Sequence, residues 1–402
     1  MNKTLIHQWL GCAVLGLCAV VAQAQAQTAT TVRIGWIGPL TGPSADFGVP
    51  MLNGARLAVE EINAAGGYLG RPIELVIKDD TGVPDVGLAR AQELIADKVA
   101  ATVGFCNTGV AMKALPVFQT AKMPLIVPCA TGTPITEKYP APESYIFRTS
   151  ARDAIQAPFV VEDIVARGWT RVAVFADTTG YGEAGLQDVI KALAAKNLKP
   201  AYIARFALGV KDLSQELKAA QAANADVVFS YTVGPENAVI ALGRKAMGWK
   251  VPQVGAWPLS FPFFIDGAKD AAEGALMAQT FIAEPSNERR RAFLSAYGRK
   301  YQVNKITVPM AAAQAYDTVY ILTYAILGIR NGDLSGPSIK AALEHMQRVY
   351  YGVTATHQNP FTKDDKDAVS MNMLVMGMVK NGTVTFAYPQ DKTKNLFVQR
   401  KK

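Results

Sequence analysis

The segment of residues 32–80 constrains the fold of this 402-residue chain more than any other stretch. It opens with a short apolar run, Val32–Ile37, which ends in the turn-forming residues Gly38 and Pro39. An apolar stripe at helical spacing follows from Met51 to Ile62, and a second strand pattern begins at Ile73 and ends at the pair Asp79-Asp80. A strand, a helix and a second strand in this order form a βαβ unit, so the segment predicts a parallel sheet. Ligands bind such open α/β sheets at the carboxyl ends of the strands.

Three consecutive blocks of this segment, GPLTGPSADFG, GARLAVEEINAAGG and LGRPIELVIKDD, resemble the opening of type I periplasmic solute-binding proteins. The family serves branched-chain amino-acid (Leu/Ile/Val) ABC importers, and the resemblance extends over nearly all of the chain after its first residues. It implies an α/β fold in which two doubly wound parallel-sheet lobes, joined by three crossing strands, close on ligand like a Venus flytrap. The crossings are expected near Phe147–Thr149, Gln279–Phe281 and Gly352–Thr354. The first lobe is then predicted to hold residues 27–148 and 280–351, and the second lobe residues 149–279 and 352–402.

The first residues are typical of a secretory signal peptide, predicted over residues 1–26. Lys3 precedes the apolar run Leu10–Ala22, and two A-x-A sites end at Ala24 and Ala26. The run is too short to predict a membrane span. Cys18 follows Leu17 rather than a small residue, so a lipoprotein is not expected. We therefore predict export to the periplasm.

The charge and the length of the chain limit which kinds of partner and which domain organisation it can have. The formal charge of +8 becomes +7 when Lys3 is removed with the signal peptide, and the basic residues are scattered except at 289–291 and 400–402. Because a nucleic-acid-binding protein gathers its basic residues on one face, no nucleic-acid partner is expected. The roughly 375 residues left exceed one ordinary domain, which agrees with two lobes. We expect a monomer. The apolar stretch Pro309–Ile329 is predicted to form a buried helix rather than a membrane span, because it carries Gln314 and Asp317.

The chain contains the glycine pattern of a dinucleotide-binding motif but lacks the acid that such a site needs. Residues 180–185 read G-x-G-x-x-G after a strand predicted at Arg171–Ala176. A dinucleotide site also needs an acid at the end of the next strand, and that strand ends Ala204-Arg205-Phe206. We interpret the motif as a glycine turn into a helix and predict no cofactor.

Signals for catalysis are weak throughout the chain. The histidines beyond the signal peptide are His345 and His357, and neither lies in a nucleophile motif. No His, Cys and Asp cluster has the spacing of a metal site. We interpret Asp79-Asp80 as solvated acids at a strand end. The sequence therefore favours a binding protein over an enzyme.

Two strand-end loops in the predicted first lobe are the best candidates for a binding site. The first loop reads Cys106-Asn107-Thr108-Gly109 and leads into a helix, and the second reads Cys129-Ala130-Thr131. Backbone N–H groups at a helix start, helped by a hydroxyl, suit a carboxylate without a formal positive charge. In the family these loops hold the ligand's carboxylate, with Thr131 matching the family threonine and Asn107 standing where serine is usual. Taken alone, the two threonines are more simply explained as helix caps.

Aromatic residues supply the second part of the candidate site. By resemblance, Phe47 lies against the ligand, and Tyr181 and Tyr231 belong to the second lobe and face the cleft, with Trp257 beside them. A strand-end aromatic is otherwise usually part of the core. Cys106 and Cys129 could pair in an oxidising compartment. The family's usual partner for the first cysteine is missing at Thr81-Gly82-Val83, and the pairing stays open.

We therefore predict the capture component of an ABC importer, which binds a small carboxylate and presents its closed form to a membrane permease. A sensory module with a separate receptor and an exported enzyme on the same scaffold are the alternatives. Amino-acid binders of this family hold the ammonium group with a glutamate just past the strand that matches Gln253–Trp257. Here no acid occurs before Asp266, so an aromatic or branched keto- or carboxylic acid is favoured. If Asp266 folds back into the cleft, the amino-acid site is restored.

Overall fold

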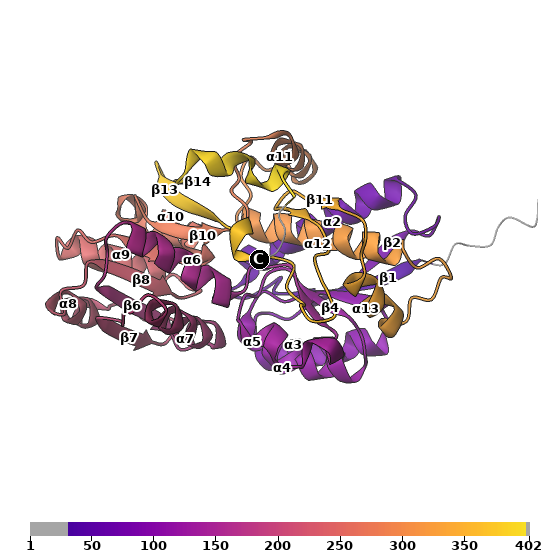
Figure 1. The fold of residues 1–402 in the computed structure, drawn as a ribbon, viewed down its shortest axis with the longest axis horizontal. Helices are drawn as coiled ribbons and strands as arrows, with labels where there is room; N and C mark the ends of the chain where they lie inside the picture. Colours follow the sequence, from indigo (N-terminus) through magenta and orange to yellow (C-terminus); the bar gives the residue numbers. More distant parts are fainter. Residues whose placement is uncertain (1–30, 399–402) are drawn as a thin grey trace, which may run out of the picture.

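The computed structural model describes residues 31–398, so the predicted signal peptide lies outside the described residues. Strands and helices alternate along the chain and gather into two open sheets with helices on their faces (Figure 1). We call the sheet that contains Val32–Gly38, with its helices, the first lobe, and the larger sheet with its helices the second lobe. The arrangement confirms the predicted α/β class with two largely parallel sheets.

The first lobe is built on five parallel strands in the order β2-β1-β3-β4-β5. Every residue of β3, β4 and β5 is buried, as expected for parallel strands covered on both faces. The strands are β1 Val32–Gly38, β2 Ile73–Asp79, β3 Ala101–Gly104, β4 Leu125–Val127 and β5 Ile146–Arg148.

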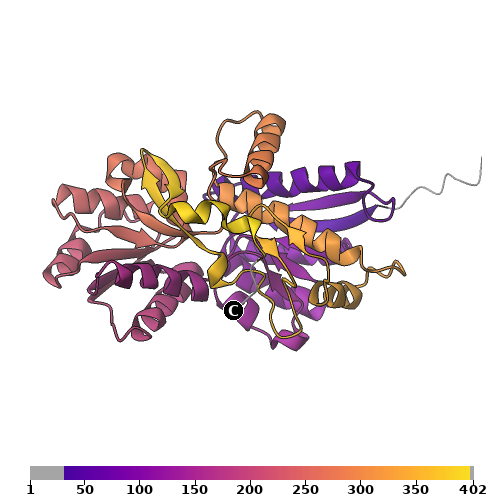
Figure 2. The ribbon, with the colours of Figure 1, turned by 45° about the horizontal axis from the view of Figure 1, so that its top comes forward.

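Helices from distant parts of the chain cover this sheet. Helices α2 (Ala45–Ala64) and α12 (Pro309–Ile326) lie side by side on one face (Figure 2). A Cβ at Gly54 of α2 would lie 2.0 Å from the carbonyl oxygen of Ala312, so glycine lets the two helices approach closely. The described residues contain no helix long and apolar enough to cross a membrane, and α12 is the buried helix that the sequence predicts. The other helices of this lobe are α3 Pro84–Ala96, α4 Thr108–Thr120, α5 Pro134–Glu137, η1 Ala141–Glu143, α11 Glu288–Tyr301 and α13 Gly336–Glu344.

The second lobe has seven strands in the order β14-β13-β10-β9-β8-β6-β7. Strands β10, β9, β8, β6 and β7 are parallel, and an antiparallel hairpin adds β13 and β14 at one edge. Asn381 and Gly382 form the tight turn of this hairpin, and both have positive φ angles, 52° and 68°. The strands are β6 Val172–Asp177, β7 Tyr202–Phe206, β8 Val227–Tyr231, β9 Gln253–Gly255, β10 Leu276–Gln279, β13 Val375–Lys380 and β14 Thr383–Phe386.

The glycines of the G-x-G-x-x-G motif have a packing role at the start of α7 (Gly180–Ala194). A Cβ at Gly182 would lie 2.1 Å from the carbonyl oxygen of Asp177, and one at Gly185 would lie 2.0 Å from the ring of Tyr231. The motif therefore lets the helix lie close against the sheet. The other helices of this lobe are α6 Asp153–Ala166, α8 Ser214–Ala222, α9 Glu236–Ala246, η2 Trp257–Ser260, α10 Pro262–Ala268, η3 Lys269–Ala272 and η4 Met371–Met373.

Three connections join the lobes, after β5, after β10 and before β13. The first and third run beside each other, where the buried Arg148 forms an ion pair with Asp367 at 2.6 Å. The third connection lies later than expected. The backbone N–H groups of Val353 and Thr354 donate to the Asp317 carboxylate of α12, which holds this stretch on the first lobe. The same stretch contains two short paired strands, β11 Tyr350–Tyr351 and β12 Thr356–His357. The chain enters the second sheet only at β13.

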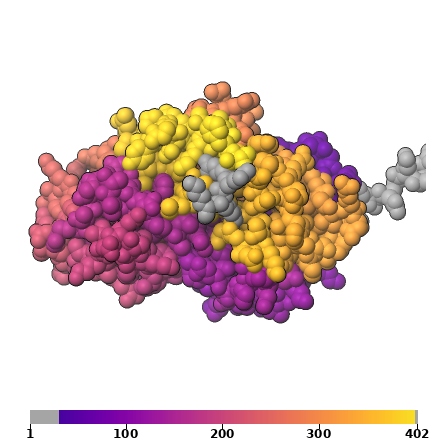
Figure 3. Space-filling view, viewed as in Figure 1, coloured from indigo at the N-terminus to yellow at the C-terminus, as the bar shows by residue number. Residues whose placement is uncertain are grey.

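The end of the described chain lies over the junction between the lobes. Figure 3 shows this segment in yellow across the middle of the molecule. It contains η5 (Pro389–Leu396), in which the buried Asn395 donates to the carbonyl of Val353 and accepts from Asn287. These contacts tie η5 to the start of α11 and to the third connection.

Candidate ligand-binding site

A cavity of about 400 Å³ lies between the lobes, at the carboxyl ends of both sheets. Each lobe contributes the point where its strand order reverses, between β1 and β3 in the first and between β6 and β8 in the second. Open α/β sheets bind ligands at this position. The lining residues are Pro43, Ser44, Phe47, Thr81, Gly82, Val83, Pro84, Cys106, Asn107, Thr108, Gly109, Val110, Thr131, Thr179, Gly180, Tyr181, Leu208, Val233, Trp257, Pro258 and Phe261.

The structure brings most of the predicted site residues to this cavity. Seven of them line it, namely Phe47, Cys106, Asn107, Thr108, Thr131, Tyr181 and Trp257. Cys129, Ala130 and Tyr231 are buried directly behind this lining. Ser44 and Phe261 also line the cavity, although neither was predicted as a site residue. Ser44 follows Pro43 and Phe261 precedes Pro262, in segments whose course the sequence pattern does not fix.

The two loops of the first lobe are joined by a disulfide between Cys106 and Cys129, with their Cα atoms 4.6 Å apart. The sequence left this pairing open. A backbone bond from the Ala130 N–H to the Phe105 carbonyl, at 3.0 Å, adds a second tie. Phe105 has a φ of 71°, an uncommon angle for a non-glycine residue, where the chain turns from β3 toward the cavity. The loops are therefore held together before any ligand arrives.

The start of α4 faces the cavity through Thr108, whose hydroxyl accepts the backbone N–H of Gly132 at 3.2 Å. A Cβ at Gly132 would lie 2.2 Å from the Thr108 methyl group, so this approach requires glycine. On the other side, Asn107 donates its amide to the hydroxyl of Ser44 at 3.0 Å. Thr108 and Asn107 are thus positioned by neighbouring loops.

Aromatic rings form the apolar wall. Phe47 of the first lobe meets Phe261 of the second at a centroid distance of 5.6 Å. Phe261 in turn packs edge-on against Trp257 at 4.8 Å. Tyr181 packs on Tyr231 at 4.9 Å, so Tyr231 supports the wall from behind. Flat rings at these separations suit a planar or apolar ligand body.

Several buried polar atoms around the cavity have no hydrogen-bond partner among the described residues. The unpartnered atoms of lining residues are the Asn107 Oδ1, the Thr131 Oγ1, the Tyr181 hydroxyl and the Trp257 Nε1. Tyr181 remains protonated because burial, followed by the charge of Asp153, raises the pKa of its hydroxyl well above its usual value. Unpaired buried polar groups are costly, so they mark places where a ligand can bond. Three of these groups donate, which matches a ligand that accepts hydrogen bonds.

The lining carries no Asp, Glu, Lys, Arg or His. Asp266, the acid that could have restored an amino-acid site, is exposed on α10 and is absent from the lining. One buried acid close to the lining is Asp153 at the start of α6, behind Thr131 and Tyr231. Asp153 was not predicted as a site residue, because an acid in the first turn of a helix usually just complements the helix dipole.

The interpretation of Asp79-Asp80 as solvated acids is wrong for Asp80, whereas Asp79 is partly exposed. Asp80 is fully buried, and its Oδ1 accepts the backbone N–H of Gly82 at 2.9 Å. Burial raises the pKa of Asp80 to about 7, against that hydrogen bond. Asp79 accepts the N–H groups of Leu40 and Thr81 and the hydroxyl of Thr41, which outweigh partial burial and lower its pKa. The pair fixes the loops at the cavity rim.

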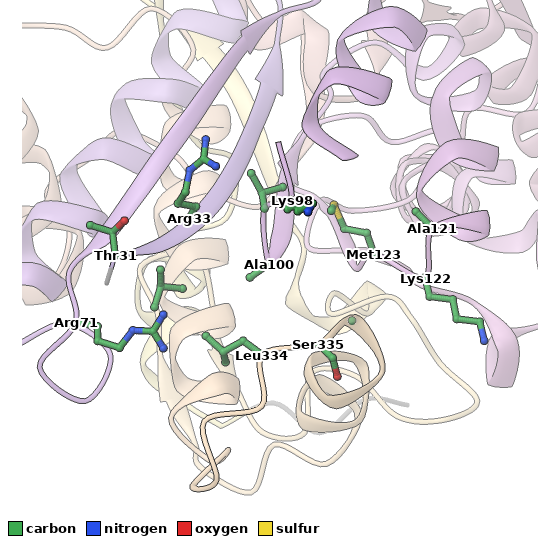
Figure 4. Close-up of a pocket in the computed structure, with 13 residues that line it drawn as sticks. Thr31, Arg33, Arg71, Lys98, Ala100, Ala121, Lys122, Met123, Leu334 and Ser335 are labelled. Carbon is green, nitrogen blue, oxygen red and sulfur yellow. The ribbon is translucent and has the colours of Figure 1, made fainter. Parts of the chain in front are cut away.

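A second hollow, of about 420 Å³, lies at the opposite end of the first sheet. Arg33, Arg71, Lys98 and Lys122 line it, but Figure 4 shows Lys122 extending away from Arg33 and Arg71. The Arg33 guanidinium already donates to the carbonyl of Asp97 at 2.8 Å. None of the unpartnered buried side-chain atoms within residues 31–398 belongs to its lining, unlike the cavity between the lobes.

A family model described as periplasmic binding protein matches residues 31–383. The chain is 36% identical over 201 residues to a Leu/Ile/Val-binding protein homolog from Brucella melitensis, which covers 49% of this chain and 53% of that protein. It is 30% identical over 263 residues to a Leu/Ile/Val-binding protein from Rhizobium johnstonii, covering 65% and 71% of the two chains.

Solved structures share the fold at low sequence identity. One is the branched-chain amino acid transporter substrate-binding protein from Streptococcus pneumoniae in complex with isoleucine, with a TM-score of 0.76, 24% identity, and coverage of 88% of this chain and 98% of that chain. Another is the ABC transporter solute-binding protein from Rhodopseudomonas palustris in complex with p-hydroxybenzoic acid, with a TM-score of 0.77, 23% identity, and coverage of 88% and 95%. At these identities the likeness shows the type I periplasmic binding fold and leaves the ligand open.

Proposed function

The chain belongs to the periplasmic binding protein family, and we propose that it captures a small carboxylate between its lobes and delivers it to the permease of an ABC importer. The relatives named above are binding proteins rather than enzymes. The observation that carries the proposal is the cavity at both strand-order reversals, which is lined by uncharged hydrogen-bond donors and aromatic rings.

We propose that the carboxylate binds on the first lobe. Thr108 and Asn107 lie at the start of α4, where free N–H groups favour an anion. Thr131 adds an unpartnered hydroxyl from the neighbouring loop. The disulfide between the two loops fixes the spacing of these groups, which reduces the entropy lost on binding.

The ligand body is proposed to be aromatic or branched, without an ammonium group. The lining offers rings from both lobes and no carboxylate. A buried ammonium group without an anionic partner is penalised by several kcal/mol, whereas one cation–π contact returns about 0.5–2 kcal/mol. Keto acids and benzoate-type acids fit this chemistry better than α-amino acids do.

Capture works by lobe closure. The described structure has the lobes in contact, since the Thr133 hydroxyl on the first lobe donates to the Asp188 carboxylate on the second at 2.6 Å. A ligand that touches Thr131 and Trp257 together contacts both lobes, and it therefore favours the closed state over the open one. The permease would then recognise the closed form.

Isothermal titration calorimetry against two matched panels tests the proposal. One panel holds benzoate, 4-hydroxybenzoate and the 2-oxo acids of leucine and phenylalanine, and the other holds leucine, isoleucine and phenylalanine. We expect binding in the first panel, at about micromolar Kd or tighter, and none in the second. Binding of a plain amino acid with no response to the corresponding oxo acid contradicts the proposed ligand class. Absence of binding in both panels contradicts the proposed function.

A further inference from the structure

We propose that Asp153 takes up a proton when an anionic ligand binds, so that capture of the carboxylate is linked to proton uptake. The inference rests on the proposed function, because it requires an anion at Thr131. It adds a positioning residue that does not itself line the cavity.

The geometry places Asp153 directly behind the lining. Its side chain is fully buried, and its backbone N–H donates to the carbonyl of Thr131 at 2.9 Å. Its Oδ1 accepts the amide of Gln156 at 3.3 Å, and the Gln156 Oε1 in turn accepts the backbone N–H of Trp257 at 3.4 Å. Asp153 therefore connects the carboxylate loop of the first lobe with the aromatic wall of the second.

The other carboxylate oxygen of Asp153 has no hydrogen-bond partner among the described residues. The hydroxyls of Thr131 and Tyr231 face it, and neither completes a hydrogen bond in this structure. A buried carboxylate with an open acceptor is costly when ionised and inexpensive when protonated. Asp153 thus sits among hydroxyls that can rearrange around it.

Burial and the neighbouring charges place the pKa of the Asp153 carboxyl close to neutral pH, so the group is partly protonated there. Burial raises the pKa of its carboxyl to about 7, the hydroxyls of Tyr231 and Thr131 oppose the rise, Asp188 of α7 adds to it and Arg148 of β5 opposes it. Tyr181 and Tyr231 stay protonated, because burial raises the pKa of each hydroxyl well above its usual value. Small changes in nearby charge therefore shift the protonation of Asp153.

A bound carboxylate makes such a change. It brings a second negative charge to Thr131, and closure removes the water that screens the two charges. The Thr131 hydroxyl has one hydrogen, which an ionised Asp153 would attract and a neutral Asp153 leaves free for the ligand. Both effects favour the protonated form of Asp153 in the complex. The proton comes from solvent, so binding should weaken as the pH rises.

Calorimetry of the whole mature protein tests this with whichever benzoate-type or 2-oxo acid binds. Titration at pH 7 in phosphate and in Tris, which differ in ionisation enthalpy, measures the protons taken up, and we expect uptake of a substantial fraction of one proton. Between pH 7 and 9 the affinity should fall by up to about tenfold per pH unit. In the Asp153→Asn variant both the proton uptake and the pH dependence should be lost.

Another carboxyl with a raised pKa serves as the matched control, Asp80 at the cavity rim. The Asp80→Asn variant should keep the proton uptake. Binding of the acid without proton uptake in the unmodified protein overturns the inference and leaves the proposed function intact, as does loss of uptake in a control variant instead of in Asp153→Asn. An affinity that rises with pH points to a cationic ligand group at Asp153 and overturns both proposals.

Discussion

At the scale of the residue, the sequence predicted the lining better than the acids behind it. Phe47, Asn107, Thr131 and Trp257 all line the cavity, because strand-end loops follow directly from the alternation of strands and helices. Their contact with a ligand stays a proposal. The environment of Asp80 could not be predicted, since its burial depends on close packing around Gly87 of α3, where an added Cβ would lie 2.3 Å from the Val110 side chain.

Thr131→Val is expected to weaken binding of the carboxylate ligand by roughly ten- to a hundredfold without unfolding the protein. The Thr131 hydroxyl is buried and unpartnered, and a hydrogen bond to a charged group contributes about 1.5–3 kcal/mol. Calorimetry measures the affinity, and Thr133→Ser, which keeps its hydroxyl, is the control. An unchanged affinity would show that Thr131 has only a structural role.

Asp80→Asn is expected to stabilise the protein at alkaline pH. Folding raises the pKa of Asp80 from 3.8 to about 7, so between these values the folded state holds a proton that the unfolded state has released. Stability from this group is therefore full below about pH 4, is lost as the pH rises to 7, and stays lost above it. Asparagine keeps the acceptor for Gly82, so urea unfolding should show a gain of up to about 4 kcal/mol at pH 8 and little change at pH 4.

Asp79→Asn is the matched control for this experiment. The pKa of Asp79 is lowered in the folded state, so its contribution is present above its unfolded pKa and is lost as the pH falls. Its substitution should destabilise the protein at pH 8. If both variants change stability in the same direction at that pH, the assignment of the two carboxyls is wrong.

At the scale of the element, the buried parallel strands were predictable from continuous apolar runs, whereas irregular segments were not. Helix α10 was not predicted, because its first residue is Pro262 and Pro258 lies just before it, and two prolines this close suggest a loop. The third connection was placed at Gly352–Thr354, but Asp317 of α12 binds that stretch through contacts more than 35 residues apart in sequence. Local patterns carry no information about such long-range bonds.

Removal of the disulfide in a Cys106→Ala, Cys129→Ala double variant is expected to lower the free energy of unfolding by about 2–4 kcal/mol. The bridge spans 23 positions and joins the two loops proposed to hold the carboxylate. Chemical unfolding of oxidised parent and double variant measures the loss, and the reduced parent is the control for the cost of the alanines themselves. Equal stability of all three proteins would mean that the backbone bond from Ala130 to Phe105 suffices to hold the loops.

At the scale of the whole molecule, polar and backbone contacts beside the ligand cavity hold the lobes together. The bond from Thr133 to Asp188 is one, and the starts of α4 and α7 form another, where a Cβ at Gly180 would lie 3.3 Å from the Cα of Gly109. The two-lobe architecture was predicted from the resemblance, but these contacts depend on how the lobes are oriented, which no local sequence pattern encodes.

Asp188→Ala is expected to weaken the closed state and to reduce ligand affinity about fivefold, which corresponds to about 1 kcal/mol for a partly exposed hydrogen bond to a carboxylate. Small-angle X-ray scattering with and without ligand measures closure as a decrease in the radius of gyration. The variant should need more ligand to reach the same compact form. Gln187→Ala, at an exposed position next to Asp188 on α7, is the control. A variant that closes at the same ligand concentration as the parent contradicts this role.

The pairing of α12 with α2 also sets the order in which this protein can fold. The Tyr316 hydroxyl donates to Glu61, 255 residues earlier in the chain, and α12 covers one face of the first sheet. Until residues near 326 have been synthesised, that face has no cover, and the first lobe cannot complete its core however early its strands appear. Contacts this distant in sequence slow folding. The first lobe therefore stays incomplete for most of the synthesis of the chain, while the contiguous residues of the second lobe from α6 to β10 are already available.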